Sequence, residues 1–275
     1  MIKYQIGNTT IEVRQWKFPD GCVGIDINNL SMDVPQRQKV DLVLVDIRFG
    51  PKEELNDDIM ALVFATRRIR KEYPLAKMML NMPYIPYSRQ DRPCNNGEGN
   101  SIADFADVIN MLKYDVVAVL DPHSNVSPAV LHNCQVFDQL AAFGQIKPSF
   151  REWTIVAPDA GATKKCEEFA KAVGAAGVLT CHKTREMSTG KITGLEFNQK
   201  VDPKGKFIVL DDICDGGRTF IELAKMFGEC DLELAVTHGI FSKGVNIVTD
   251  WYDHVYTTDS LFRGDPSYKL TVIKI

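Results

Sequence analysis

Three carboxylates stand directly before two glycines and an arginine in FIVLDDICDGGRTFIELAKMF, residues 207–227. The apolar run FIVL predicts a buried strand, and the pattern after the glycines predicts a helix. Backbone N–H groups of residues 216–219 would then face a phosphate at the positive end of that helix. Asp211, Asp212 and Asp215 would repel the phosphate unless they bind something else, and vicinal sugar hydroxyls or a bridging Mg²⁺ suit carboxylate oxygens. An acidic cap before an ordinary turn is the alternative.

Short β-type runs alternate with helical patterns along the chain, and this order predicts parallel sheets covered by helices. We expect an α/β fold of two doubly wound domains with mostly parallel sheets, residues 1–146 and 147–275. The polar, Gly-containing segment 184–200 is interpreted as a mobile loop or a β-hairpin. Expected strands are 40–47, 76–84, 115–122, 153–159, 176–183, 206–212, 232–241 and 254–260, and expected helices are 56–73, 101–113, 162–174 and 219–229.

Composition bounds the classes of protein that fit. The 275 residues are 45% hydrophobic, enough for a substantial core, and a formal net charge of −4 gives no reason to expect nucleic acid as a partner. No apolar run approaches the ~20 residues of a membrane helix, and the first ten residues lack a signal-peptide pattern, so we expect a cytoplasmic protein without a membrane partner. Seven cysteines without a CxxC pair argue against a zinc ribbon and a disulfide framework. Cys214 has no visible partnering base.

Ligands of parallel α/β sheets bind beyond the carboxyl ends of the strands, so residues just after each apolar run are the candidates for chemistry. This rule selects five segments: 86–93, 120–125, 157–165, 181–185 and 210–219.

These segments together resemble the ribose-phosphate pyrophosphokinases. DDICDGGRT is similar to the phosphoribosyl-diphosphate-binding loop that this family shares with type I phosphoribosyltransferases. YSRQDRP resembles the family's ATP-binding YxRQDR segment, LDPHS its metal-binding DLH segment, APDAG its PDxG segment, HKTR its catalytic KRR loop and THGIFS its THGLFS strand. The motifs occur in the family's order from about residue 18 to 242, and an ordered set is far more specific than any one motif.

The resemblance implies two ATP-binding segments. Phe18 and Asp20 would reach the adenine of ATP bound to a neighbouring subunit, although Cys22 replaces the glutamate of the family's FxDGE pattern. A shared adenine site implies a homo-oligomer, a dimer or a hexamer. The second segment would hold the ATP base and phosphates, with a solvated charged turn as the alternative; it comprises Arg89, Gln90, Asp91 and Arg92.

The resemblance also implies the metal ligands and the catalytic cations. His123 and Asp159 would bind Mg²⁺, the expected cofactor. Lys183 and Arg185 keep the first and third basic positions of the family's catalytic loop. The implied substrates are ATP and a ribose 5-phosphate: the anomeric hydroxyl attacks the β-phosphorus of ATP, AMP leaves, and positioned cations stabilise the transition-state charge.

The implied ribose-phosphate site departs from the family pattern DDxxDTxGT. Gly216 replaces a threonine, which removes a hydroxyl donor, and Arg218 replaces a glycine, which adds a planar cation suited to phosphate oxygens. We therefore expect an altered 5-phosphate site, and one hypothesis is an acceptor such as ADP-ribose, giving its 1-pyrophosphate for NAD salvage. The site would comprise Asp211, Asp212, Asp215, Gly216, Gly217, Arg218 and Thr219.

Three other classes of function stay open. A phosphoribosyltransferase would need the DDICDGGRT loop but not the RQDR segment, and would usually be one domain. A non-catalytic regulatory relative would lack the cations at 183 and 185, which this chain has. A structural protein would leave the ordered motifs as coincidence.

Overall fold

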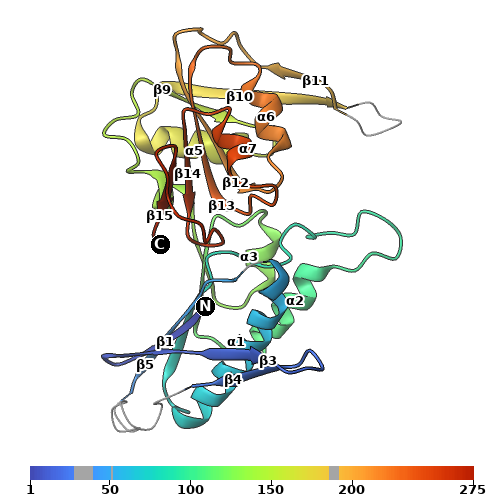
Figure 1. Cartoon of the computed structure of the whole chain (residues 1–275), viewed down its shortest axis with the longest axis vertical. Helices are drawn as coiled ribbons and strands as arrows, with labels where there is room; N and C mark the ends of the chain where they lie inside the picture. Colours follow the sequence, from blue (N-terminus) through green and yellow to red (C-terminus); the bar gives the residue numbers. More distant parts are fainter. Residues whose placement is uncertain (28–39, 51, 186–191) are drawn as a thin grey trace. The chain divides into compact units, whose positions relative to one another are not determined.

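The computed structural model describes residues 1–27, 40–50, 52–185 and 192–275. The chain divides into two compact units, Met1–Phe137 and Asp138–Ile275 (Figure 1). The sequence places the domain boundary after residue 146, at the end of a short helix that the structure assigns to the second unit, α4 (Gln139–Phe143). Each unit is built on its own sheet.

The first unit has a six-stranded sheet in the order β2-β1-β5-β6-β7-β8. Its parallel part joins β5, β6, β7 and β8, whereas β1 pairs antiparallel with both β2 and β5. Apolar alternation explains which face turns inward, because Val43, Val45 and Ile47 are buried while the residues between them are more exposed. The strands are β1 (Ile2–Ile6), β2 (Thr9–Glu12), β5 (Leu42–Ile47), β6 (Lys77–Asn81), β7 (Val116–Leu120) and β8 (Cys134–Phe137).

A long amphipathic helix, α1 (Leu55–Glu72), follows the 3-10 turn η2 (Lys52–Glu54) and buries Leu62, Ala65 and Ile69 at helical spacing. A small two-stranded sheet, β3 (Arg14–Lys17) with β4 (Val23–Asp26), contacts α1. The first unit also contains α2 (Ser101–Asn110) and α3 (Val126–Val130), which contact each other.

The second unit has a seven-stranded sheet in the order β11-β10-β9-β12-β13-β14-β15. All neighbours are parallel except β10 and β11, which form an antiparallel pair. The strands are β9 (Trp153–Ala157), β10 (Gly177–Arg185), β11 (Ile192–Phe197), β12 (Lys206–Cys214), β13 (Asp231–Gly239), β14 (His254–Thr258) and β15 (Leu270–Ile273).

Helices α5 (Thr163–Val173), α6 (Arg218–Ala224) and α7 (Asn246–Thr249) complete the second unit. Gly174, with φ +66°, ends α5 in the left-handed conformation that glycine adopts at little cost. Phe207, Phe220 and Phe227 are buried in the core with residues of β13, so the aromatic side chains fill the space between α6 and the sheet.

The predicted fold class, two α/β units with mostly parallel sheets, is confirmed. Within 184–200 the described residues of β10 and β11 form an antiparallel pair, which favours the hairpin interpretation. The antiparallel strands β1 to β4 carry no strong signal in the sequence and were not predicted.

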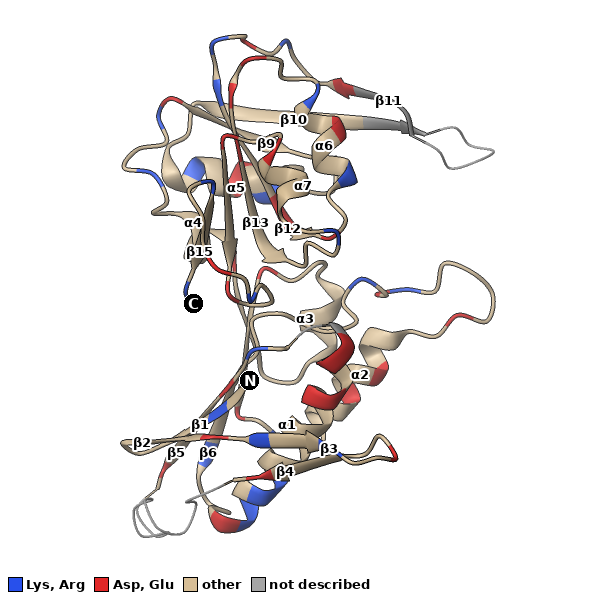
Figure 2. Cartoon of the chain, viewed as in Figure 1, with Lys and Arg blue, Asp and Glu red and all other residues tan. Residues whose placement is uncertain are grey.

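Basic and acidic residues are interspersed along both units (Figure 2), in keeping with the small net charge. No described helix has the length and apolarity needed to cross a membrane.

A largely buried ion pair between Lys147 and Glu233 ties the first part of the second unit to its sheet. The Lys147 ammonium lies 2.6 Å from a carboxylate oxygen of Glu233 on β13, and the two side chains are only 14% and 11% exposed. The same ammonium donates to the Tyr256 hydroxyl at 3.1 Å and lies 4.3 Å from the centre of the Trp153 ring. Removing the lysine would leave the Glu233 charge poorly hydrated and unpaired.

We expect Lys147→Met to lower the free energy of unfolding of the second unit by about 3 kcal/mol, because it breaks a poorly hydrated charge pair. Lys206→Met is the matched control. Its partner Glu152 is 77% exposed, so this change should cost less than about 1 kcal/mol. Urea unfolding of the full chain measures the change in the free energy of unfolding for each variant. Equal changes for Lys147→Met and Lys206→Met would contradict the stabilising role of the Lys147–Glu233 pair.

Candidate functional site

The carboxyl end of β12 projects beyond its neighbour β9. Pairing of β12 with β9 ends at Val209 with Val156, whereas pairing with β13 continues to Cys214 with Gly239. Asp211 and Asp212 therefore lie within the strand, as the expected strand 206–212 has them, and the strand continues two residues further to Cys214. The reason is the longer ladder with β13, which keeps residues 210–214 extended.

Three acidic side chains gather at this edge. Asp159 is the second residue after β9, and its Oδ1 accepts hydrogen bonds from the N–H groups of Gly161 (3.0 Å) and Ala162 (3.3 Å). The pKa of Asp211 is raised well above its usual value, first by burial, then by the charge of Asp212 and a hydrogen bond with that carboxyl, and further by Asp159. The carboxyls at this edge repel one another when ionised, and a bound cation or hydroxyl donors would reduce this repulsion.

Cys214 is buried next to these acids. Burial and the charges of Asp211 and Asp215 raise the pKa of its thiol to about 12, against a hydrogen bond from the Gly217 N–H that lowers it. A thiol with this pKa is neutral at physiological pH and a poor nucleophile. The Gly217 N–H also points to sulfur, so it is not among the N–H groups presented to a phosphate in this conformation.

The loop after β12 requires glycine at 217. Gly217 has φ +73°, and a Cβ there would lie 3.0 Å from Ile247 and 3.1 Å from Val248. Arg218 is the first residue of α6 and is exposed, with no hydrogen bond or ion pair to a described side chain other than an electrostatic effect on Glu222. Thr219 follows it and is half-buried.

The turn after β13 lies against this loop, and its role was missed in the sequence. Ser242 Oγ donates to Asp215 Oδ1 at 2.6 Å, and the Ser242 N–H donates to the Asp215 carbonyl at 3.2 Å. The stem of Lys243 lies beside Gly216: a Cβ at Gly216 would be 3.6 Å from Cε and 3.7 Å from Cδ. The motif THGIFS ends at Ser242, and no local pattern in the sequence indicates that the next residue reaches the DDICDGGRT loop.

The residues predicted to bind ATP lie in two loops of the first unit. Phe18 and Asp20 form the tip of the β3–β4 hairpin, where Phe18 is 47% exposed and packs edge-on against Trp16. Asp20 accepts a hydrogen bond from the Cys22 N–H at 3.0 Å, which shapes the tip. An exposed aromatic ring at a hairpin tip suits a contact with a flat ligand or another subunit.

The RQDR loop lies between Tyr87 and α2. Tyr87 has φ +62°, its hydroxyl donates to Asn56 on α1, and the Gln90 side chain accepts a hydrogen bond from the Ser101 hydroxyl at the start of α2. Gln90 and Asp91 are half-buried, while Arg89 and Arg92 are exposed. The loop is thus anchored by its polar side chains and presents its guanidinium groups to solvent.

The predicted metal ligands belong to different units. His123 is exposed and follows β7 in the first unit, and Asp159 belongs to the second. Among the described residues no group of three or more His, Cys, Asp and Glu side chains could hold a metal ion. The pairing of His123 with Asp159 at one ion stays a prediction, and so do the roles of Lys183 and Arg185. These two belong to β10, opposite Leu195 and Ile192, and their side chains lie outside the described part.

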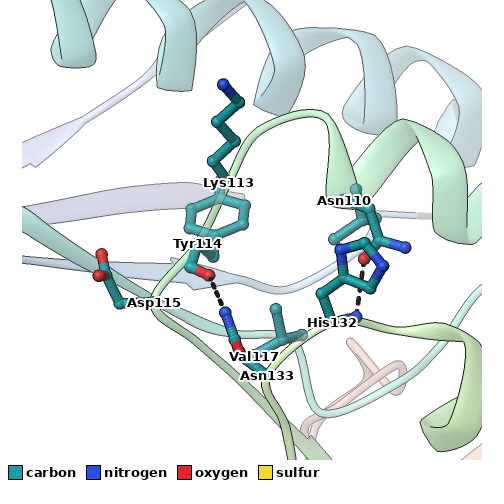
Figure 3. Close-up of a pocket in the computed structure, with 8 residues that line it drawn as sticks. Asn110, Lys113, Tyr114, Asp115, Val117, His132 and Asn133 are labelled. Carbon is teal, nitrogen blue, oxygen red and sulfur yellow. Dashed lines mark hydrogen bonds between the residues drawn. The ribbon is translucent and has the colours of Figure 1, made fainter.

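A separate pocket of about 230 Å³ lies at the amino ends of β7 and β8 (Figure 3), at the sheet edge opposite the predicted ligand edge. Asn133 donates to the Tyr114 carbonyl at 2.9 Å, and the Asn110 side chain accepts from the His132 N–H at 2.8 Å. These bonds hold the turns that line the pocket, which contains no predicted site residue.

Comparison with known proteins gives a consistent set of relatives. The chain is 28% identical over 245 residues to the ribose-phosphate pyrophosphokinase of Pyrococcus abyssi, covering 85% of this chain and 78% of the relative. It is 25% identical over 273 residues to that of Thermococcus kodakarensis, covering 93% and 88%. No protein-family model matches.

The fold has a solved counterpart. The structure of phosphoribosylpyrophosphate synthetase from Mycobacterium smegmatis matches with a TM-score of 0.75 at 19% identity, covering 96% of this chain and 86% of that one. The likeness spans both units, so the two-unit α/β architecture is that of this structure.

The buried thiol gives one test of the site's electrostatics. At about pH 8 we expect iodoacetamide to alkylate the exposed Cys22 and Cys94 but not Cys214, since its raised pKa and burial leave little accessible thiolate. Peptide mass spectrometry measures each site, with urea-unfolded protein as the control in which all cysteines react. If Cys214 of the native protein reacts as fast as Cys22, the thiol is neither buried nor raised in pKa as described.

The acidic crowding gives a second test. Because the folded-state pKa of Asp211 is raised, ionising this carboxyl costs stability as pH rises above its usual value of 3.8. Asp211→Asn should therefore raise the midpoint of thermal unfolding by ~2 °C or more at pH ~7 and bring no gain near pH ~3, where both states are protonated.

Asp265→Asn, at an exposed loop position, is the control and should leave the midpoint unchanged at both pH values. Scanning calorimetry without added divalent cations decides between the outcomes. If Asp211→Asn instead lowers the midpoint at neutral pH, the ionised Asp211 carboxylate is stabilised by its neighbours in the folded protein, which contradicts the prediction.

Proposed function

Because the chain belongs to the ribose-phosphate pyrophosphokinase family, we propose that it transfers the β,γ-diphosphoryl group of ATP to the anomeric hydroxyl of ribose 5-phosphate. The products would be phosphoribosyl pyrophosphate and AMP. The observation that carries this proposal is the gathering of Asp159, Asp211 and Asp212 at the carboxyl edge of the second unit's sheet. This is the edge at which parallel α/β sheets bind ligands.

Asp211 and Asp212 would hold the ribose through its vicinal hydroxyls. Each hydroxyl donates a hydrogen bond to a carboxylate oxygen, and a charged acceptor makes that bond stronger than a neutral one. The raised pKa of Asp211 supports this role, because carboxyls that crowd one another gain most from donors supplied by a ligand.

The chemical step needs positioning and charge compensation more than a strong base. A bond forms between the anomeric oxygen and the β-phosphorus, the bond from that phosphorus to the α,β-bridging oxygen breaks, and the hydroxyl proton is released. Lys183 and Arg185 would stabilise the charge on the transferred oxygens, while Arg89 and Arg92 would hold the nucleotide phosphates. The neutral Cys214 thiol argues against a covalent cysteine intermediate.

Mg²⁺ fits the donors present. This ion usually takes one or two protein ligands and completes its shell with water and substrate phosphate oxygens, so a cluster of three protein ligands is not required. Asp159 and His123 would hold it, and when bound it neutralises phosphate charge in the transition state. The acid-crowded edge around Asp159 is a setting that a cation relieves.

We further propose that the active form is a homo-oligomer, with Phe18 and Asp20 reaching ATP on a neighbouring subunit. The exposed Phe18 ring at the tip of the β3–β4 hairpin supports this arrangement.

An acceptor with a larger 5-substituent, such as ADP-ribose, is the second candidate. Position 216 carries no side chain, and Arg218, two positions further along the loop, is exposed. A loop that adds a planar cation where the family has a glycine brings positive charge for a second phosphate. The product would be ADP-ribose 1-pyrophosphate.

A product assay separates these functions. With ATP and Mg²⁺ we expect AMP release that requires an acceptor, and a mass gain of one diphosphoryl group on ribose 5-phosphate or ADP-ribose. Release of ADP would indicate transfer of a single phosphate. No turnover of ADP-ribose would end the second candidate, and consumption of phosphoribosyl pyrophosphate with a base would indicate a phosphoribosyltransferase.

Lys183→Ala should lower turnover by ~10²-fold or more with little change in ATP affinity, as expected of a group that acts mainly in the transition state. Lys204→Ala is a matched control, since Lys204 is an exposed lysine of the same unit outside the site. Turnover is followed by AMP release and ATP affinity by calorimetry. Undiminished turnover in the Lys183 variant removes this residue from the mechanism.

A further inference from the structure

We infer that Lys243 binds the anionic 5-substituent of the acceptor sugar and takes over the part that a side chain at position 216 would otherwise play. The inference rests on the proposed function, since it names a further specificity-determining residue of the same site. It depends on how the turn after β13 is built, on where the lysine stem lies, and on the charges around it.

The turn is tied to the loop after β12. The N–H groups of Ile240 and Phe241 both donate to the Cys214 carbonyl, at 2.9 and 3.1 Å, and Ser242 makes its two hydrogen bonds to Asp215. Four hydrogen bonds from three consecutive residues thus fix the turn to the loop. The lysine that follows is therefore carried by a backbone of defined position.

The buried side chain of Phe241 anchors the same turn in the core. Its backbone has φ +44°, which is uncommon for a bulky residue, and its side chain is 6% exposed and packs edge-on against Phe262 with ring centres 5.4 Å apart. Gly244, with φ +89°, closes the turn through its N–H to the Phe241 carbonyl at 2.8 Å. Burial of the ring offsets the backbone cost and holds residues 242 and 243 on the loop side.

The stem of Lys243 lies within van der Waals contact of the place that a Cβ of residue 216 would take. A Cβ at Gly216 would make ordinary contacts of 3.6 Å with Cε and 3.7 Å with Cδ of the lysine. The ammonium group makes no hydrogen bond or ion pair with any residue in the described part of the chain. The loop thus lacks a hydroxyl donor at 216 and has a cation beside the same position.

The surroundings explain why an anion would need this cation. Asp211, Asp212 and Asp215 all precede the loop, so a phosphate bound there lies near several negative charges. Arg218 supplies one positive charge on the loop, and Lys243 supplies a second from the neighbouring turn. Two cations on separate segments suit a phosphate dianion or a diphosphate, and charge-assisted hydrogen bonds from them are stronger than those of a threonine hydroxyl.

The substrate class follows from this chemistry. The 5-substituent must be a phosphoryl group, either the monoester of ribose 5-phosphate or the first phosphate of a diphosphate such as ADP-ribose. A neutral sugar such as ribose would gain nothing from Lys243.

The test compares Lys243→Met, which keeps most of the stem and removes the charge, with Lys243→Arg, which keeps the charge. We expect Lys243→Met to raise the KM for the phosphorylated acceptor by about 10- to 100-fold, the usual range for losing one hydrogen bond to a charged group. The kcat and the KM for ATP should change by less than about 2-fold, because the residue contacts only the acceptor's 5-substituent. Lys243→Arg should restore most of the affinity.

Binding of ribose 5-phosphate and of ADP-ribose, measured by calorimetry without ATP, gives a readout independent of catalysis, and a thermal melt checks folding. Lys225→Met is the matched control, an exposed lysine whose ammonium pairs with Glu222. An active enzyme whose acceptor KM and Kd are unaffected by Lys243→Met overturns the inference and leaves the proposed function intact. Lys243-dependent binding without AMP formation supports the inference and overturns the proposed function, and absence of both binding and turnover overturns both.

Discussion

The repulsion among the carboxyls of Asp159, Asp211 and Asp212 is the constraint on which the candidate site depends. Folding places these groups at one sheet edge and raises the pKa of Asp211 through burial and neighbouring charge. A structure selected for stability alone would not gather acids in this way, because their ionisation opposes folding at neutral pH. The cost makes sense if a ligand brings hydroxyl donors or a cation to the same edge.

The sheet geometry accounts for this gathering. The pairing of β12 with β9 ends at Val209, whereas its pairing with β13 continues to Cys214. Asp159, the second residue after β9, therefore comes close to Asp211 on the longer strand. The same pairing brings the turn after β13 next to the loop after β12, where the Ser242 hydroxyl donates a hydrogen bond to Asp215. One extended strand pairing therefore positions both the acids and the turn that carries Lys243. The site is a consequence of strand lengths as much as of residue types.

The balance of charge differs between the two sides of the loop. Toward the strand lie the acids Asp159, Asp211 and Asp212, which suit a sugar diol and a metal ion. Toward the turn and α6 there are Lys243 and the exposed Arg218, which suit a phosphoryl group. A phosphorylated pentose has the same polarity, with hydroxyls at one end and phosphate at the other. The fit between the two patterns favours a sugar phosphate over a free nucleotide as the ligand of the second unit.

The sequence by itself determined the fold class and the short list of candidate residues. Alternating β and helical periodicities specify a parallel α/β architecture, and ordered motifs such as YSRQDRP and DDICDGGRT carry the family resemblance. Both signals are local, so they can be recognised without coordinates. The antiparallel strands β1 to β4 lacked such a signal, because edge strands and hairpins are stabilised by their partners more than by their own pattern.

Only the tertiary structure decided that β12 stays paired with β13 as far as Cys214, that Cys214 is a buried neutral thiol, and that Lys243 stands beside Gly216. The reason is physical: strand ends, burial and contacts between distant turns depend on ladder lengths and packing between segments far apart in the chain. Lys243 is 27 positions beyond Gly216, counting 243 − 216, and no periodicity links them. Their contact exists because two parallel strands end side by side.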